Sequence, residues 1–272
     1  MLFALCLFPA IVSGQCKLEQ DFFSVNERLN YDVYFNWKFV WVKAANAEMK
    51  SQSTAYKGTA AYKTLLTGKT KGVIDNVYRV NDTLMCYVSS ANLAPLFYSK
   101  AAHEGKSYSA YEEITYSYPG NPTVKARLQD WRNKKFKSDT VLTSQKCFYD
   151  ALSQFYFIRS LIPENMAVTK SITIPILFTD ESFDVKVAYK GTETVEIDKE
   201  KINTVKYSLS IDGEAFANKK ESVFVWLSLD ENRIPVMIES KLKVGSIKAL
   251  LKKASGCRNP YEAFPDDSKI VK

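Results

Sequence analysis

Histidine, glycine and long apolar runs are scarce in this sequence, and each scarcity excludes a class of function. His103 is the only histidine, and no CxxC or HxxxH-type pair occurs, so the ligand spacings of common metal sites are missing. None of the ten glycines forms a GxGxxG or GxxxxGK[ST] loop that would cradle phosphates. No G-x-S-x-G nucleophile elbow is present. We therefore expect no metal, no cofactor and no catalytic residue, and predict that the protein is not an enzyme.

The apolar stretch at the start of the sequence is too short to span a bilayer. Residues 1–14, MLFALCLFPAIVSG, end in small residues, and Val12 and Gly14 fit the small-x-small rule of a cleavage site. A transmembrane helix needs roughly 20 apolar residues. The pattern predicts a signal peptide over residues 1–14. We accordingly expect export to the periplasm, with association with the outer membrane as a further option.

The charge balance is basic, with 37 Lys and Arg against 30 Asp and Glu and a net charge of +7. Export argues against a nucleic-acid partner. Two stretches carry much of the positive charge, Lys125–Lys137 and Lys241–Lys253. A solvated outer face explains both. The functional alternative is contact with an anionic membrane surface, where each basic residue contributes about 1 kcal/mol.

Apolar and polar residues alternate from Arg28 onward, which is the pattern of half-buried strands. The alternation is clear in RLNYDVYFNW, SFDVKVAYKG, TVKYSLSIDG and RIPVMIESKLKVG. SITIPILF and SVFVWLSLD are apolar on both faces, so their strands are covered on both sides or line a cavity on one. YPGNP, RNKK and SLDENRIP are typical of hairpin turns, and IDGE of a strand end. The sixteen Tyr and sixteen Phe also favour strands.

One segment has the period of a helix. Apolar residues recur at helical spacing in SQKCFYDALSQFYFIRSLIP, with Ser144 as N-cap and Pro163 at the end. A shorter helix is expected over Gly72–Val80. The predicted fold is mainly β with minor α. It is a curved antiparallel sheet or half-open barrel, with one main helix packed on it or plugging it.

We predict a single β-rich domain over residues 27–253. A short N-terminal segment over residues 15–26 would precede it, and an irregular C-terminal tail over residues 254–272 would follow it.

Three stretches resemble a known family. NERLNYDVYFNWKFVWVKAANAEM, CFYDALSQFYFIR and VWLSLDENRIPVMIESKLKVGSIKALL, in that order, are similar to the exported bacterial family named domain of unknown function 3108. The resemblance covers roughly Glu27 to Leu251. Its more specific parts are the Asp150 to Ser153 start with Arg159, and the Asp230 to Pro235 turn. We assign Asp150 and Arg159 a structural role in anchoring the helix. At the level of fold alone, the arrangement is also similar to periplasmic lipoprotein carriers.

Two functions remain open. The first is an exported cell-envelope protein that binds a lipid or other hydrophobic ligand in a β-sheet cavity. Its candidate ligand-binding residues are aromatic: Trp37, Trp41, Phe97, Phe155 and Trp226. The alternative is a structural or interaction module of the envelope that binds a protein or glycan partner. The oligomeric state is not readable from the sequence.

Four cysteines remain after removal of the leader: Cys16, Cys86, Cys147 and Cys257. They allow three pairings. Lipidation of Cys16 is the other option, but Gln15 occupies the position where a lipobox needs a small residue. Cys16 and Cys257 both lie in polar terminal segments just outside the β domain, and chain termini often lie close together. We therefore predict a Cys16–Cys257 disulfide.

Overall fold

The computed structural model describes residues 16–18, 20–37, 40–120, 122–211, 223–241 and 245–260. The expected signal peptide, the predicted turn after residue 211 and the part of the tail beyond residue 260 lie outside these ranges. The side chain of Trp37 is also outside the described set.

Fourteen strands form one antiparallel sheet in the described part of the chain. They are β1 (Arg28–Trp37), β2 (Val40–Tyr56), β3 (Thr59–Thr70), β4 (Asn81–Ser89), β5 (Pro95–Glu104), β6 (Tyr108–Gly120), β7 (Thr123–Arg132), β8 (Lys135–Ser144), β9 (Ser171–Phe178), β10 (Glu181–Ile197), β11 (Glu200–Ile211), β12 (Val223–Ser228), β13 (Pro235–Lys241) and β14 (Ser246–Ser255). The helices are α1 (Gly72–Val77), α2 (Ser153–Ser160) and α3 (Pro163–Thr169).

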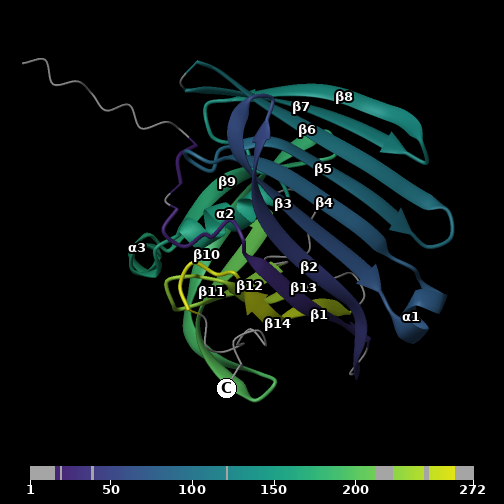
Figure 1. Ribbon diagram of the computed structural model, residues 1–272, viewed down its shortest axis with the longest axis vertical. Helices are drawn as coiled ribbons and strands as arrows, with labels where there is room; N and C mark the ends of the chain where they lie inside the picture. Colours follow the sequence, from purple (N-terminus) through teal and green to yellow (C-terminus); the bar gives the residue numbers. More distant parts are fainter. Residues whose placement is uncertain are drawn as a thin grey trace, which may run out of the picture.

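The sheet consists of two meanders joined by their terminal strands. β1 to β8 follow one another, as do β9 to β14, and β1 pairs with β14, which leaves β8 and β9 as the two edges. The sheet curves strongly and α2 lies within the curve (Figure 1). Tyr149 partly bridges the open seam, because its backbone pairs with β9 at Ile176. The prediction of a curved antiparallel sheet or half-open barrel with one main helix is confirmed.

Burial follows the alternation read from the sequence. In β6, Ala110, Glu112, Ile114 and Tyr116 are buried and their neighbours are more exposed, so every second side chain points into the curve. The hairpin turns are confirmed as well. Asn133 and Lys134 join β7 to β8 with φ of 49° and 63°, the positive values that a two-residue type I′ turn needs.

The main helix is shorter than expected, and this prediction needs correction at both ends. Residues 147–152 are irregular, and α2 begins at Ser153. The apolar residues before it are buried because the segment packs along β9, where Tyr149 exchanges backbone hydrogen bonds with Pro175 and Leu177. Pro163 does not end a helix but begins α3, where its missing N–H costs no hydrogen bond. The short helix predicted after Gly72 is confirmed as α1.

Two clusters of apolar side chains stabilise the fold. The larger one surrounds α2 and draws side chains from both meanders, including Cys86, Leu128, Ile176 and Val225. The smaller one forms where the far end of the β10–β11 hairpin meets other strands, and it includes Ile197, Leu29, Trp226 and Leu251. The larger cluster places α2 at the centre of the molecule, so the candidate site is built around this helix.

Candidate functional site

The N-terminal end of α2 is fixed by Asp150. Its Oδ1 accepts hydrogen bonds from the backbone N–H groups of Leu152 and Ser153, both at 2.9 Å. The Ser153 hydroxyl donates to Oδ2 at 2.8 Å and accepts from the Asp150 N–H at 2.9 Å, which is the reciprocal pattern of a capping box. Tyr116 on β6 also donates to Oδ2, at 3.0 Å. Burial raises the pKa of Asp150, and these hydrogen bonds oppose that shift.

The C-terminal end of α2 is fixed by Arg159, which is 2% exposed. Its two terminal nitrogens, Nη1 and Nη2, donate to the two carboxylate oxygens of Glu27 at 2.6 and 2.8 Å, and Nη2 also donates to the carbonyl of Asn232 at 2.9 Å. Burial alone would lower the pKa of Arg159, but the Glu27 carboxylate outweighs that effect and the pKa is raised. The structure thus places Asp150 and Arg159 at opposite ends of α2, each tying the helix to the sheet or to the segment before β1.

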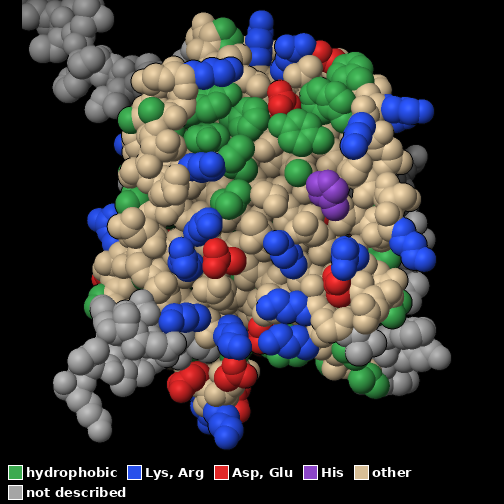
Figure 2. All heavy atoms as spheres, turned by 45° about the vertical axis from the view of Figure 1, so that its right-hand side comes forward, with side chains coloured by type: hydrophobic (Ala, Val, Ile, Leu, Met, Phe, Trp, Pro, Cys, Tyr) green, Lys and Arg blue, Asp and Glu red, His purple; other side chains and the backbone are tan. Residues whose placement is uncertain are grey.

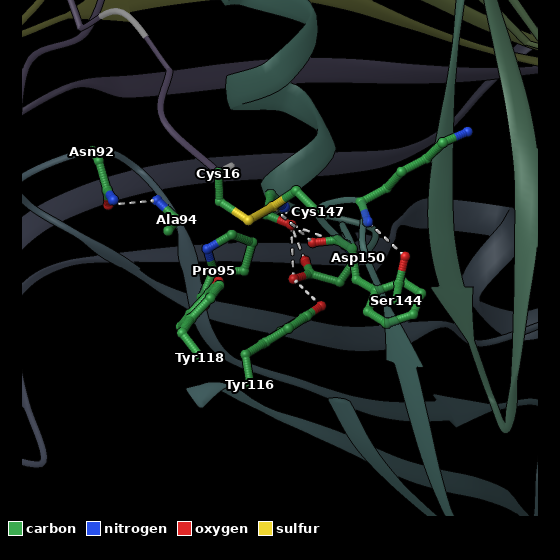
Figure 3. The surroundings of a disulfide bond; sticks show 12 residues. Cys16, Asn92, Ala94, Pro95, Tyr116, Tyr118, Ser144, Cys147 and Asp150 are labelled. Carbon is green, nitrogen blue, oxygen red and sulfur yellow. Dashed lines mark hydrogen bonds between the residues drawn. A yellow bond between two sulfur atoms is a disulfide. The ribbon is translucent and has the colours of Figure 1, made fainter. Parts of the chain in front are cut away.

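A disulfide joins Cys16 to Cys147, with the Cα atoms 5.3 Å apart (Figure 3). The prediction of a Cys16–Cys257 bond is therefore wrong, and Cys257 is a free thiol. Cys257 follows the end of β14, where Ser255 pairs with Arg28. The chain lies near that point at Gln20, whose carbonyl accepts from Arg258, but Leu18 donates a backbone hydrogen bond to Asn92 at 3.0 Å, in the loop between β4 and β5. Cys16 consequently meets the segment that precedes α2.

One side of α2 borders an apolar cavity of about 120 Å³. Gln154, Phe155 and Ile158 of the helix form one wall. Aliphatic and aromatic side chains of β9 to β13 form the other: Ile176, Phe178, Val185, Leu209, Val223, Val225 and Ile238. The Gln154 amide is the polar side chain in this lining. An engineered cavity of about 150 Å³ with a similar lining stays dry and binds benzene. The arrangement can therefore hold an apolar ring or a short alkyl chain.

Larger recesses in the described part of the chain have a different character. A groove of about 800 Å³ runs along β1 to β3 and carries both charges, including Asp32, Lys69 and Lys252. A recess of about 350 Å³ lies beside the disulfide and is bordered by Cys16, Asn92 and Tyr118. The cavity beside α2 differs from both because it lies between the helix and the sheet.

Of the predicted aromatic residues, Phe155 lines the cavity. Trp226 is buried in the smaller cluster, where its indole N–H donates to Glu193 and lowers the pKa of that carboxyl. Trp41 is 39% exposed, with the Lys248 ammonium 4.6 Å from its ring centroid. Phe97 stacks on Tyr56 on the outer face of the sheet. Trp37 cannot be placed because its side chain lies outside the described residues.

Sequence reasoning missed the aliphatic side chains that form most of the lining. Ile176 and Val225 belong to the two strands that are apolar on both faces, and that pattern was the available signal. Large aromatic residues are not a better guide, because they also fill cores and outer faces.

No constellation for catalysis or metal binding is visible within the described ranges. His103 is exposed at the end of β5, and no group of three or more His, Cys, Asp or Glu side chains could hold a metal there. Among the same residues no helix is long and apolar enough to cross a membrane.

The fold defines a class of proteins in which one long curved antiparallel sheet wraps around a short helix. The chain belongs to the family described as "Protein of unknown function (DUF3108)", which matches residues 30–252. This confirms the family resemblance read from the three stretches of sequence.

Two solved structures are similar. The beta-barrel-like protein of the domain of unknown function DUF1849 from Brucella abortus has a TM-score of 0.53 at 12% identity, covering 85% of this chain and 98% of that one. At this identity the likeness shows the fold alone. A protein with a YmcC-like fold from Bacteroides fragilis has a TM-score of 0.33 at 10% identity, covering 86% and 99%. No curated protein matches the sequence.

Proposed function

We propose that this chain is a periplasmic cell-envelope protein that holds an apolar ligand between α2 and strands β9 to β13, and that it binds without catalysing a reaction. The observation that carries the proposal is the apolar cavity of about 120 Å³ between α2 and the sheet. Protein cores are close-packed, and a gap lined by aliphatic side chains forfeits dispersion contacts that a ligand would restore.

Location in an oxidising compartment is supported by the Cys16–Cys147 bond. Disulfides persist in secreted and periplasmic proteins and are rare where glutathione and thioredoxin keep thiols reduced. The apolar stretch over residues 1–14 is consistent with export.

The size of the cavity limits the ligand. Pockets for drug-sized ligands usually measure about 300–1,000 Å³, so this cavity accepts one acyl chain end or one ring rather than a whole lipid. The walls of the cavity suit an acyl chain end or a ring, because the lining is aliphatic or aromatic apart from Gln154. The polar end of such a ligand would remain outside.

The test measures the binding of toluene, a probe with one ring, by isothermal titration calorimetry, and its displacement by fatty acids of increasing chain length. We expect the intact chain to bind the probe and a Val223→Phe variant to bind it at least about fivefold more weakly, since one excluded ring or a few methylenes are worth 1–3 kcal/mol. Leu96→Phe, which fills the recess beside the disulfide, is the matched control and should bind normally.

Equal loss in both variants, or probe binding unaffected by Val223→Phe, would contradict the proposal. Circular dichroism and thermal melting of each variant show whether the fold survives. Where Val223→Phe melts early, Leu209→Met, which conserves volume but reshapes the wall, provides the second comparison.

A further inference from the structure

The outer face of the first meander carries aromatic side chains that the cavity does not use. Tyr111 on β6, Trp131 on β7 and Phe136 on β8 form a triad. The ring centroids of Tyr111 and Trp131 are 5.4 Å apart, and those of Trp131 and Phe136 are 5.6 Å apart. Phe136 is 55% exposed and Tyr111 39%. Figure 2 shows hydrophobic side chains gathered over the upper part of this face, with Lys and Arg side chains around them.

A second triad lies two residue pairs further along the strands. Tyr56 contacts Tyr87 at 4.9 Å and Phe97 at 5.5 Å between ring centroids. The outward pair of Ser99 and Glu113 separates the triads, since Phe97 pairs with Thr115 and Tyr111 with Ala101. We call the six aromatic residues the outer aromatic band.

Lysines accompany both triads. The ammonium groups of Lys57 and Lys63 lie 5.2 and 5.9 Å from the ring centroids of Tyr56 and Tyr87. Lys134, Lys135 and Lys137 are exposed in the β7–β8 hairpin, next to Phe136 in the sequence. An ammonium over an aromatic face is attracted by the ring, which keeps the charge beside the apolar surface.

Carboxylates on the same face are already engaged. Asp139 accepts from the Arg127 guanidinium at 2.8 Å, and Glu113 accepts from the Tyr111 hydroxyl at 3.0 Å. The Glu113 carboxylate keeps its charge, because the tyrosine hydroxyl is neutral, but the lysines beside the aromatic band outnumber it and leave this face with an excess of positive charge.

We propose that the outer aromatic band docks on the surface of an anionic lipid bilayer. Aromatic side chains favour the level of the lipid head groups, where an apolar ring can be buried while its polar edge stays wet. The lysines complement the phosphates, each worth about a fivefold change in affinity near such a surface. The docking is independent of the apolar cavity, which opens to other strands.

An acidic glycan is the competing partner for a basic aromatic face. The rings of the triad are inclined to one another, with interplanar angles of 51° between Tyr111 and Trp131 and 66° between Trp131 and Phe136. Tyr56 and Phe97 of the second triad are stacked at 30°, but the inclined rings of the more exposed first triad offer no continuous flat platform for sugar rings, whereas they can insert as edges into a soft interface. The geometry favours the bilayer.

The experiment measures co-sedimentation of the full chain with vesicles of phosphatidylglycerol mixed with phosphatidylcholine, and with pure phosphatidylcholine. We expect binding to the anionic vesicles that weakens as salt rises. A variant with Lys134→Gln, Lys135→Gln and Lys137→Gln should bind about tenfold to a hundredfold more weakly. Lys186→Gln, Lys199→Gln and Lys201→Gln remove three exposed lysines elsewhere and should change affinity by less than about threefold.

A second measurement keeps the charge and the aromatic character of the band. Tryptophan fluorescence is followed as vesicles with brominated acyl chains are added. We expect quenching that is lost in Trp131→Phe and retained in Trp41→Phe, the matched exposed tryptophan.

Three results would overturn the proposal: equal binding to neutral vesicles, equal loss in both lysine variants, or quenching that survives in Trp131→Phe. Binding to an anionic polysaccharide that depends on the band, without binding to either vesicle, would assign this face to a glycan instead.

Discussion

The two sides of α2 meet the sheet in different ways. On the side of the first meander, the Tyr156 hydroxyl hydrogen-bonds Thr64 and lies 3.5 Å from the Ser51 hydroxyl, while Phe23 packs edge-on against its ring at 5.0 Å. On the side of β9 to β13, Phe155 and Ile158 face aliphatic side chains across the cavity.

The two sides of α2 differ in how strongly they fix the position of the helix. Hydrogen bonds are directional and specify the position of the helix, whereas contacts between aliphatic side chains do not. The cavity walls on β9 to β13 can therefore adjust around a ligand without breaking a hydrogen bond of Phe155 or Ile158. The β12–β13 loop, in contrast, is tied to the helix end, because Arg159 donates to Asn232 and accepts from Arg233. The predictions below test this asymmetry, from the largest effect to the smallest.

Loss of the buried ion pair is expected to be the most damaging change. Glu27→Gln leaves the Arg159 guanidinium buried without a counter-charge, which should lower the free energy of unfolding by about 3–5 kcal/mol. Urea denaturation followed by circular dichroism measures it. Glu239→Gln, which breaks the half-exposed contact with Lys248, should change stability by less than about 1 kcal/mol. The pair Glu27→Met with Arg159→Met should recover part of the loss, and a Glu27→Gln effect no larger than the control would contradict the anchoring role.

Opening the disulfide should have the next largest effect. Its cysteines are 131 residues apart, so Cys16→Ser releases a long loop and should lower the free energy of unfolding by about 2–5 kcal/mol. Thermal melting with and without reductant checks this. Cys257→Ser is the matched control, and reductant should lower its melting temperature as in the unchanged chain. Peptide mapping that found Cys16 joined to Cys257 would reverse the assignment.

Removal of a single hydroxyl tests the fixed side of the helix directly. Tyr156→Phe removes the hydroxyl that contacts Ser51 and Thr64. These two hydroxyls then have only each other as partners, and the loss should cost about 1 kcal/mol of stability. Phe155→Leu on the cavity side removes no hydrogen bond and should cost less. Hydrogen exchange of the α2 amides measures the effect. Equal protection in both variants would contradict the proposed difference between the two sides of the helix.

The effect of pH should be smaller and has a defined sign. Burial raises the pKa of Asp150 above its ordinary value of 3.8, so the native state keeps this proton to higher pH than the unfolded chain does. Its contribution to stability is then greatest below its ordinary pKa and falls as pH rises through the native-state pKa. The unfolding free energy of the intact chain minus that of Asp150→Asn should therefore decrease as pH rises above about 4. Asp139→Asn should show the opposite slope, because Arg127 lowers the pKa of Asp139.

The sheet was largely predictable because a period of two leaves little choice of register. A shift by one residue in β6 would turn Ile114 and Tyr116 outward and bury Thr115. The hairpins at Asn133–Lys134 and at Asp230 were likewise readable from local turn chemistry. These features depend on neighbours in sequence.

The helix boundary, the disulfide and the cavity depend on contacts between distant segments. Residues 147–152 show helical spacing, yet Tyr149 is held by β9, a strand that the spacing cannot reveal. Cys16 meets Cys147 because the segment before β1 packs against α2, where Phe22 contacts Arg159 and Phe23 contacts Tyr156, and no local pattern predicts that path. Phe155 was found through the periodicity of the helix, whereas Leu209 looked like any other strand residue.

Pairing of β1 with β14 has a consequence for the order of folding. Arg28 of β1 lies opposite Ser255 of β14. β1 is made early and can pair with β2, but it can pair with β14 only when nearly the whole chain is present. Until then β1 offers an unpaired edge, and contacts of such long range form slowly. In a chain made amino terminus first, this edge of the first meander therefore stays open until β14 has been made.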